Sequence, residues 1–357
     1  MTQRPAGLLR RTVLASTLAL AACGKSSQGQ PASLPPRSLK SAPFPVGASV
    51  MTGELNDPAF VAILDQNISE LTPEWEMKME YILQPDGALK FEAPDAIAAF
   101  ARAHGMRLHG HALVWYAQDG AAFQAARNDK AAFGRTYDGY IAQVVGRYRG
   151  FTRSWDVVNE PVRDDGSALR DSLWSRTLGE TGYIVRAFEQ AAAADPGAVL
   201  FLNDYGLESV PAKRAQFLRL VERLLREGCK LGGLGCQSHI DIDLPAGAMA
   251  AALKDLAGVG LPIHLSELDI STHMKKLDLR SPDERLRLQA DKAAEVASAF
   301  MALPARQRHA FTLWGLRDKD SWLRGPAGTG PADRPSMFDD GGAPKPAFEA
   351  LARTFAP

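Results

Sequence analysis

The chain has 357 residues, of which 46% are hydrophobic and 23% are charged. This balance is typical of a globular protein and excludes a disordered or fibrous chain, and the length suits one large domain or two of average size. Lysine plus arginine and aspartate plus glutamate each total 41, so the formal net charge is zero. Without a basic excess to attract phosphates, the sequence argues against a dedicated nucleic-acid binder.

The N-terminus has the pattern of an export signal. Arg4, Arg10 and Arg11 precede an apolar run over residues 13–22, which is too short to span a bilayer as a helix and fits a signal-peptide core. The run ends in Leu-Ala-Ala-Cys-Gly over residues 20–24, which resembles a bacterial lipobox and implies cleavage before Cys23 and lipidation of that cysteine. An ordinary secretory signal with an incidental cysteine is the alternative, and the Arg pair indicates twin-arginine export only weakly.

The predicted organisation has three parts. Residues 1–22 form a lipoprotein-type signal peptide, and residues 23–42, rich in Ser, Gln and Pro, form a flexible tether with a lipidated Cys23. Residues 43–357 form the folded domain. We therefore expect an exported protein, lipid-anchored to a bacterial membrane on the periplasmic side or at the cell surface. Cys229 and Cys236 either form a disulfide or remain two buried thiols.

Eight short apolar runs are candidate strands, and they lack clean alternation, as expected for parallel strands buried on both faces. They cover residues 45–51, 68–72, 107–115, 154–162, 199–205, 234–240, 262–269 and 310–316.

Amphipathic segments separate these runs. Helices are predicted over residues 95–104, 211–228, 282–301 and 348–355, the second opening with Pro and ending at Gly, and the third preceded by a capping box from Ser281 to Glu284. Strands that alternate with helices predict a (β/α)8 TIM barrel. A doubly wound open sheet is the alternative, but no Gly-rich phosphate loop follows the first strand.

Polar side chains follow the predicted strands at their C-terminal ends, where barrels build their active sites. They combine carboxylates, Glu160 and Glu267 among them, with amides, imidazoles and tryptophans, a mixture that suits the hydroxyl groups and flat faces of a sugar. Two carboxylates that flank the scissile bond are what glycoside cleavage requires, with one protonated and the other ionised. The candidates are Glu74, Lys78, His111, Trp115, Asn159, Glu160, Asn203, Asp204, Tyr205, Gln237, His239, Glu267, Asp269, Trp314, Asp318 and Trp322.

The motifs in which these residues stand resemble those of the glycoside hydrolase family 10 xylanases, in order along the chain from about residue 45 to the C-terminus. The acid/base signature is matched by Trp-Asp-Val-Val-Asn-Glu-Pro over residues 155–161, and the nucleophile strand by Leu-Ser-Glu-Leu-Asp over residues 265–269. Further matches are Leu-Thr-Pro-Glu (71–74), Met-Lys (77–78), Gly-His-Ala-Leu-Val-Trp (110–115), Asn-Asp-Tyr (203–205), Gln-Ser-His (237–239), Trp-Gly (314–315), Asp-Lys-Asp-Ser-Trp (318–322) and Lys-Pro-Ala-Phe (345–348).

The resemblance implies a retaining endo-1,4-β-xylanase that acts on xylan and xylo-oligosaccharides by double displacement. Glu160 would be the acid/base and Glu267 the nucleophile, with their carboxyl groups about 5–5.5 Å apart. His239 and Asp269 would support Glu267, and Asn159 would bond the 2-hydroxyl of the sugar being cleaved.

We expect a monomer that needs no cofactor and no metal. The resemblance also implies a set of substrate-binding residues. Glu74, Lys78 and His111 would line the sugar sites on the non-reducing side. Trp314 and Trp322 would wall these sites, Tyr205 would hold the leaving side, and Trp115 and Gln237 complete the set.

The sequence departs from the family pattern at four positions near these motifs. Trp75 stands where Asn is usual, Met79 where Trp is common, Tyr116 where His is usual and Gly206 where Asn is frequent. The reaction type is therefore better supported than the glycan preference, and a related β-glycanase with altered subsites is an alternative.

Two other interpretations compete. His109 and His111 have the spacing of a metal-binding pair on one strand face, although the remaining ligands are not evident. A surface lipoprotein could instead bind glycan without cutting it. Taken singly, each candidate also has an ordinary structural interpretation: the histidine and tryptophans as core residues, Asn203 and Asp204 as caps, and Lys78 as a solvated charge.

Overall fold

The computed structural model describes residues 38–273, 278–326 and 328–356. The predictions of a signal peptide over residues 1–22 and of lipidation at Cys23 lie outside these residues. The strands of the described part are β1 (Val46–Val50), β2 (Glu70–Pro73), β3 (Arg107–Gly110), β4 (Val114–Trp115), β5 (Thr152–Asn159), β6 (Val199–Asp204), β7 (Gly233–Cys236), β8 (His239–Asp241), β9 (Ile263–Ser271) and β10 (Arg308–Leu313).

The strands close into a parallel barrel. Their order around the ring is β10–β1–β2–β3–β5–β6–β7–β9, and β9 pairs back onto β10. β4 continues the position of β3 beside β5, and β8 continues the position of β7 beside β9. The eight-stranded (β/α)8 barrel predicted from the sequence is thus confirmed.

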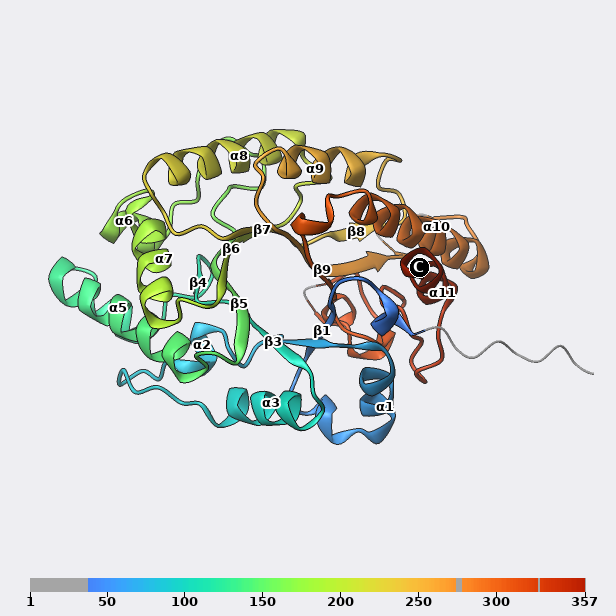
Figure 1. The fold of residues 1–357 in the computed structure, drawn as a ribbon, viewed down its shortest axis with the longest axis horizontal. Helices are drawn as coiled ribbons and strands as arrows, with labels where there is room; N and C mark the ends of the chain where they lie inside the picture. Colours follow the sequence, from blue (N-terminus) through green and yellow to red (C-terminus); the bar gives the residue numbers. More distant parts are fainter. Residues whose placement is uncertain (1–37, 274–277, 327, 357) are drawn as a thin grey trace, which may run out of the picture. The chain divides into compact units, whose positions relative to one another are not determined.

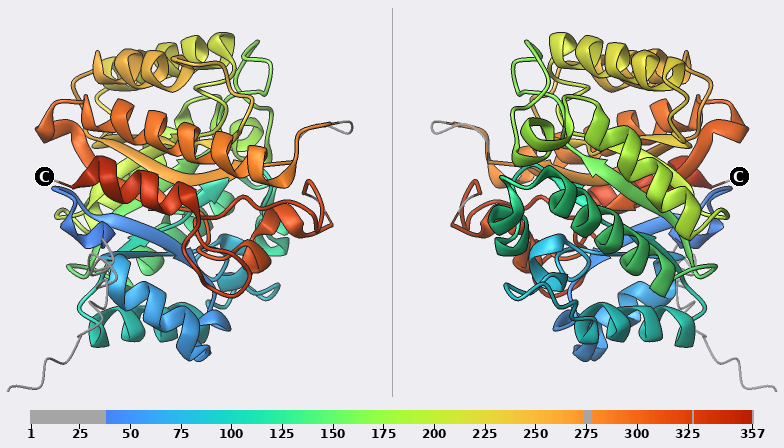
Figure 2. Two further views of the ribbon diagram at one scale, coloured as in Figure 1. Left: turned by 90° about the vertical axis from the view of Figure 1, so that its right-hand side faces the viewer. Right: turned by 90° about the vertical axis from the view of Figure 1, so that its left-hand side faces the viewer.

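Helices surround the barrel and cover the outer faces of its strands (Figures 1 and 2). They are α1 (Pro58–Asn67), α2 (Met79–Ile82), α3 (Glu92–Ala103), α4 (Ala121–Ala126), α5 (Lys130–Arg147), α6 (Leu173–Leu178), α7 (Gly182–Ala194), α8 (Pro211–Arg226), α9 (Ala248–Ala257), α10 (Pro282–Met301) and α11 (Pro346–Phe355). Short 3-10 helices are η1 (Leu39–Ser41), η2 (Glu54–Asn56), η3 (Ala305–Gln307), η4 (Asp318–Asp320) and η5 (Trp322–Arg324).

Each of the eight predicted apolar runs overlaps one position of the barrel, but two of the runs are broken. The run over residues 107–115 ends as β3 at Gly110 and resumes as β4 at Val114. The run over residues 234–240 is interrupted at Gln237 and Ser238, because Ser238 has a φ of +65°, in the left-handed region that a strand does not contain. Both breaks lie at the C-terminal end of the barrel.

Two of the long helices form where the periodicity predicts them. α10 spans the predicted residues 282–301, and the Ser281 side chain accepts from the backbone N–H of Glu284, as the capping motif indicates. α8 buries Phe217, Val221 and Leu224 on one face, and Lys213 in its first turn is buried as well.

The N-terminal boundary of the folded part differs from the predicted one. Residues 38–42, which we predicted as the end of the tether, contain η1, and its Leu39 is fully buried in the core. Lys40 donates to the carbonyl of Asp65 at 2.6 Å, at the end of α1. The burial of a leucine side chain stabilises this attachment by about 2 kcal/mol. The Ser- and Pro-rich composition of the segment did not indicate that it would pack against the barrel.

Two further features concern membrane and redox chemistry. None of the helices in the described residues combines the length and the apolarity needed to cross a bilayer. Cys229 and Cys236 are both buried free cysteines, so of the two alternatives the structure has the free thiols.

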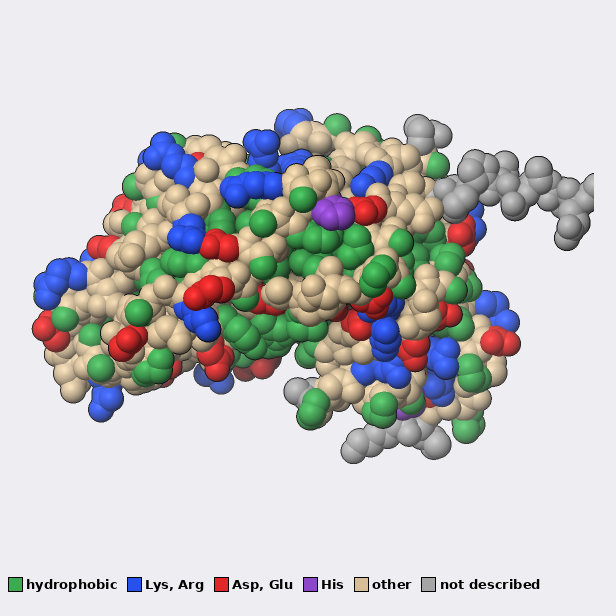
Figure 3. All heavy atoms as spheres, turned by 90° about the horizontal axis from the view of Figure 1, so that it is seen from below, with side chains coloured by type: hydrophobic (Ala, Val, Ile, Leu, Met, Phe, Trp, Pro, Cys, Tyr) green, Lys and Arg blue, Asp and Glu red, His purple; other side chains and the backbone are tan. Residues whose placement is uncertain are grey.

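The surface carries both signs of charge close together. On the face drawn in Figure 3, lysine and arginine side chains alternate with aspartate and glutamate side chains, in keeping with the zero net charge of the chain. One such pair of opposite charges is bidentate: Arg186 Nε and Nη2 donate to the two carboxylate oxygens of Asp138.

Candidate active site

The predicted polar side chains come together at the C-terminal end of the barrel. Glu160 directly follows β5, Tyr205 follows β6, and Glu267 and Asp269 lie within β9. Most of the set is buried, whereas Trp322 is 38% exposed, as suits a side chain at the mouth of a cleft.

β5 and β9 each contain a bulge close to a catalytic candidate, Glu160 at the end of β5 and Glu267 within β9. β5 carries one extra residue between Asp156 and Val158 relative to β6, and β9 carries one extra residue between Leu265 and Leu268 relative to β10. Such bulges re-aim the side chains beside them and are frequent next to active sites.

Glu160 is further placed by its own backbone. Its φ is +56°, in the left-handed region that non-glycine residues rarely adopt, and its N–H donates to the carbonyl of Asn203 at 2.7 Å. Strain of this kind costs on the order of 1–3 kcal/mol and is concentrated at functional sites.

Three side chains donate hydrogen bonds to the Glu160 carboxyl group. Trp115 Nε1 donates to Oε2 at 2.7 Å, while Asn159 Nδ2 and Gln237 Nε2 donate to Oε1 at 3.1 and 3.0 Å. The residue Glu160 is 8% exposed. Its carboxyl group is therefore held in one direction but can still be reached from the cleft.

Glu267 lies deeper, among groups that favour its ionised form. Asn203 Nδ2 donates to Oε1 at 2.7 Å, and His239 Nε2 lies 3.3 Å from Oε2. Burial opposes ionisation, but His111 and His239 outweigh it, so the pKa of Glu267 lies below its usual value. An ionised carboxylate is what a nucleophile requires.

His239 owes its charge to a second carboxylate. Its Nδ1 lies 2.9 Å from Asp269 Oδ2, which also accepts from Trp322 Nε1 at 2.8 Å. Burial opposes protonation of His239, yet Asp269 and Glu267 outweigh it and raise its pKa well above the usual value. The predicted support of Glu267 by His239 and Asp269 is present in the geometry.

Amide side chains join the two catalytic candidates. Asn159 Oδ1 accepts from Asn203 Nδ2 at 2.9 Å and from Gln237 Nε2 at 3.2 Å, so one network contacts both Glu160 and Glu267. Gly235 makes room for it, since a Cβ there would lie 2.2 Å from Asn203 Oδ1. The carboxyl groups are therefore held relative to each other by rigid planar groups.

Lys78 is buried inside a group of three tryptophans and is not a solvated charge. Its ammonium lies 3.9, 5.0 and 5.8 Å from the ring centres of Trp75, Trp115 and Trp314, within or near cation–π range. Burial lowers its pKa, while Glu267 and Glu74 oppose that shift.

Glu74 stands beside this lysine and accepts from Ser49 Oγ at 3.3 Å. Burial raises the pKa of Glu74 to about 7, although Lys78 opposes the shift. Glu74 is thus able to donate or accept a hydrogen bond near neutral pH, which suits a ligand with hydroxyl groups.

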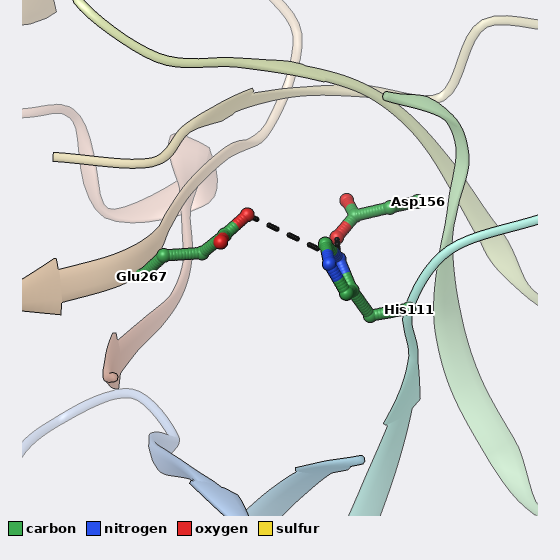
Figure 4. Close-up of side chains that lie close together, drawn as sticks. All are labelled: His111, Asp156 and Glu267. Carbon is green, nitrogen blue, oxygen red and sulfur yellow. Dashed lines mark hydrogen bonds and ion pairs between the residues drawn. The ribbon is translucent and has the colours of Figure 1, made fainter. Parts of the chain in front are cut away.

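His111 contacts a third buried carboxylate (Figure 4). Its Nδ1 lies 2.8 Å from Asp156 Oδ2 and 4.0 Å from Glu267 Oε1. These three side chains could hold a metal ion, because their ligand atoms lie within 4.8 Å of one another. Each of these atoms is already engaged in the hydrogen bonds described, and His109 also binds Asp156, at 2.9 Å. His109 and His111 therefore both contact the Asp156 carboxylate, which accounts for their spacing without a metal ion.

Tyr205 belongs to a cluster on the other side of Glu160. Arg170 donates to the Tyr205 hydroxyl at 2.7 Å and to the Glu160 carbonyl at 3.0 Å, and it stacks 4.2 Å from the Tyr116 ring centre. Asp164 accepts from Tyr205 and Arg170. Beside them lies a cavity of about 420 Å³ lined by Tyr116, Arg163, Asp164, Asp165, Arg170 and Asp171. Tyr205 is the residue that was predicted to hold the leaving side.

Replacing Lys213 by methionine is expected to destabilise the fold by about 3–5 kcal/mol, because it leaves the fully buried Asp204 unpaired. Lys213 Nζ lies 2.8 Å from Asp204 Oδ1 and 3.3 Å from the Tyr205 ring centre. Urea unfolding measures the change.

The loss should grow with pH. Burial raises the pKa of Asp204 to about 7 even with Lys213 present, against about 3.9 in an unfolded chain. Both proteins lose stability between about pH 4 and 7 as Asp204 ionises in the unfolded chain, but without Lys213 the folded-state pKa rises further, so the extra loss in the variant grows above about pH 7. The double variant Lys213→Met/Asp204→Asn should recover most of the loss, and an equal loss in single and double variants would contradict the pairing.

Sequence reasoning missed the roles of three residues at the site. Asn203 was named as a site candidate without a specific role, and it bonds the nucleophile candidate and Asn159. Asp156 was quoted only as part of the acid/base signature, and His109 only as part of a possible metal-binding pair. Their signal was present in the alternation of β3 and β5, which points His109, His111, Ser154 and Asp156 to the same interior face.

The family comparison agrees with this geometry. The sequence profile described as glycosyl hydrolase family 10 matches residues 37–354. Endo-1,4-beta-xylanase B of Paenibacillus barcinonensis is 34% identical over 317 residues, covering 85% of this chain and 93% of that protein. Endo-1,4-beta-xylanase of Geobacillus stearothermophilus is 34% identical over 318 residues, covering 85% and 94%.

Solved structures show the same likeness. Xylanase B from Clostridium stercorarium F9 superposes with a TM-score of 0.80 at 32% identity, covering 88% of this chain and 99% of that one. A mutant structure in complex with xylotriose matches with a TM-score of 0.80 at 34% identity, covering 88% and 97%. With the profile spanning nearly the whole folded part and these relatives aligned along most of their length, the chain belongs to glycosyl hydrolase family 10.

Proposed function

We propose that the protein is a retaining endo-1,4-β-xylanase that hydrolyses internal bonds of xylan. The observation that carries the proposal is the pair of carboxyl groups joined by one amide network, with Glu267 kept ionised by His239. The relatives named above are endo-1,4-β-xylanases, and one similar structure holds xylotriose.

The first step forms a glycosyl-enzyme. Glu267 attacks the anomeric carbon while Glu160 protonates the departing glycosidic oxygen, so that the C–O bond to the leaving sugar breaks as the bond to Glu267 forms. Trp115, Asn159 and Gln237 aim Glu160 at that oxygen.

The second step releases the sugar with its original configuration. Glu160, now deprotonated, takes a proton from water, which attacks the anomeric carbon and displaces Glu267. The fixed network keeps the reacting groups in place through both steps, which lowers the barrier because little reorganisation remains.

The subsite residues divide into two sides. Glu74, Lys78, His111 and Trp314 bind the sugars on the non-reducing side, and Tyr205 with Arg170 and Tyr116 binds the leaving side. Trp322 covers the mouth, where its indole is tied to Asp269.

A related β-glycanase with altered subsites is the second candidate, and Trp75 favours it. The Trp75 ring covers Lys78 at 3.9 Å and lies 6.0 Å from the half-exposed Tyr81 ring. A flat apolar wall therefore occupies the position where the family pattern has an amide.

Restoring asparagine at Trp75 should lower KM for unsubstituted xylotriose by about three- to tenfold, since one hydrogen bond contributes on the order of 1 kcal/mol. Initial rates with xylobiose, xylotriose and xylotetraose measure the effect. Trp75→Phe keeps the wall and should change KM less than about twofold. An unchanged KM in Trp75→Asn would argue against this subsite difference.

The experiment that tests the function compares sugar release from glucuronoxylan, carboxymethyl-cellulose and a β-1,3-glycan. We expect xylan cleavage to oligosaccharides, with no comparable release from the other two. Preference for another of these polymers would support the second candidate. Tight glycan binding without any cleavage would instead support a binding lipoprotein.

We also propose that the mature protein is a lipoprotein anchored through Cys23 to a bacterial membrane, with the signal peptide at residues 1–22 removed. The sequence pattern alone supports this step. Growth with a radiolabelled fatty acid should label the wild-type protein, and Cys23→Ala should abolish the label and release the protein from the membrane fraction. Labelling that persists in Cys23→Ala would overturn the assignment.

A further inference from the structure

The loop that follows Glu160 turns back on itself and brings an arginine to this residue. The turn has the sequence Arg-Asp-Asp-Gly, and the N–H of Gly166 donates to the carbonyl of Arg163 at 2.9 Å. Asp and Gly are typical of such turns. The returning strand of this hairpin is fixed at Arg170, whose N–H donates to the carbonyl of Pro161 at 2.7 Å. The side chain of Arg170 therefore starts beside the backbone of Glu160.

The tip of this hairpin is anchored on the next part of the barrel. Gly166 has a φ of +70°, and a Cβ at this position would lie 2.3 Å from the backbone nitrogen of Lys213, in the first turn of α8. Only glycine allows this close approach of two backbones. The hairpin is thus held in place independently of any contact that Arg170 makes.

Arg170 uses its guanidinium to join Glu160 to the leaving side. Its Nε donates to the carbonyl of Glu160 at 3.0 Å, and its Nη2 donates to Asp164 at 2.6 Å and to the Tyr205 hydroxyl at 2.7 Å. The Tyr116 ring centre lies 4.2 Å from the guanidinium. The Arg170 side chain is only 11% exposed. A planar fork with this many fixed acceptors has one orientation.

The backbone of Glu160 is the part of the site that most needs such a restraint. Its φ of +56° is strained, and strain of this kind persists only where the surroundings over-determine it. On one side, the N–H of Glu160 donates to the carbonyl of Asn203 at 2.7 Å. On the other side, the carbonyl of Glu160 accepts from Arg170. A change of this backbone would turn the Cα–Cβ bond and move the carboxyl group with it.

We propose that Arg170 is a positioning residue, which holds the strained backbone of Glu160 through its carbonyl and so aims the carboxyl group at the departing glycosidic oxygen. The proposal rests on the proposed role of Glu160 as acid/base. It gives Arg170 a part in the chemical step, beyond the binding of the leaving sugar. Because the same guanidinium contacts Tyr205 and Tyr116, one group fixes both the acid and the wall of the leaving side.

The first test measures whether the loss depends on the need for a proton. The substrates are aryl β-xylobiosides whose leaving groups range from dinitrophenolate, which departs without a proton, to phenolate, which needs one from Glu160. In Arg170→Gln, kcat/KM should fall about 10- to 100-fold for the phenyl substrate and less than about threefold for the dinitrophenyl substrate. Loss of leaving-side binding alone would lower kcat/KM equally across the series, and this result would overturn the proposal.

Two further variants control this comparison. Arg176→Gln removes a nearby arginine on α6, which pairs with the exposed Asp171 at 2.8 Å. It should change kcat/KM by less than about twofold throughout, as expected for a surface ion pair. Arg170→Lys keeps the charge but not the planar fork. It should show a smaller loss with the same dependence on the leaving group, and it carries the test if Arg170→Gln does not fold.

The second test needs no substrate. Trp115 Nε1 donates to Glu160 Oε2 at 2.7 Å, so the indole N–H signal of Trp115 reports where the carboxyl group lies. The full-length chain, labelled with ¹⁵N-tryptophan, contains six tryptophans, and Trp115→Phe identifies the signal. We expect this signal to move upfield in Arg170→Gln, because the hydrogen bond weakens, and to stay in place in Arg176→Gln. An unshifted signal in Arg170→Gln would overturn the proposal.

The outcomes separate this proposal from the proposed function. Failure of the wild-type protein to cleave both xylan and the aryl xylobiosides rejects the function. The Trp115 indole signal then still decides whether Arg170 holds Glu160 in place. Cleavage by the wild type, together with an equal fall across the aryl series in Arg170→Gln, keeps the function and rejects the positioning role.

Discussion

Glu267→Ala is expected to lower kcat on xylan by roughly 10⁴-fold or more, with the fold intact. The loss is this large because Glu267 would form the covalent bond that divides the reaction into two easier steps. Its carboxylate is also the group to which Asn203 and His239 are directed, so removal leaves those donors without their acceptor. Initial rates with xylan measure the loss, and thermal unfolding checks the fold.

Azide distinguishes a nucleophile from a general structural residue. In Glu267→Ala a small anion can enter the vacated space and attack the anomeric carbon directly, with Glu160 as the acid, which yields an α-glycosyl azide. The matched control is Glu70→Gln, which alters another fully buried glutamate at the start of β2. It should retain most of the activity. Full activity in Glu267→Ala, or an equal loss in Glu70→Gln, would reject the assigned role.

The sequence allowed the barrel to be predicted because its strands are continuous apolar runs and its helices are amphipathic. β9 and α10 lie close to their predicted bounds for this reason. The breaks between β3 and β4 and between β7 and β8 could not be predicted, because they depend on backbone conformations such as the positive φ of Ser238. The attachment of residues 38–42 was also missed, since it depends on one leucine.

The candidate site could be located from strand ends and family motifs, but its connections could not. That Glu160 and Glu267 share an amide network depends on two bulges and on the absence of a side chain at Gly235. Periodicity gives the face of a residue, whereas a bulge shifts that face by one position. The burial of Lys78 among tryptophans could likewise be seen only in the structure, because Trp75 and Trp314 are far apart in the sequence.

Glu160→Ala should show a different pattern, which depends on the leaving group. On xylan, kcat should fall about 10²- to 10⁴-fold, the usual contribution of a general acid–base. On an aryl xylobioside with a dinitrophenolate leaving group, the first step needs no proton, so glycosyl-enzyme should form rapidly and accumulate. A burst of phenolate followed by a slow steady state measures this.

Azide should then accelerate the slow phase of Glu160→Ala, because it needs no base to attack the glycosyl-enzyme. It attacks from the face opposite Glu267, so the product is a β-glycosyl azide. Trp115→Phe is an informative companion, since it removes the 2.7 Å hydrogen bond to Glu160 Oε2 and leaves the carboxyl group present. It should lower kcat on xylan modestly, without the burst. An α-glycosyl azide from Glu160→Ala would reverse the two assignments, because the configuration of the product reports which face of the sugar the remaining carboxylate occupies.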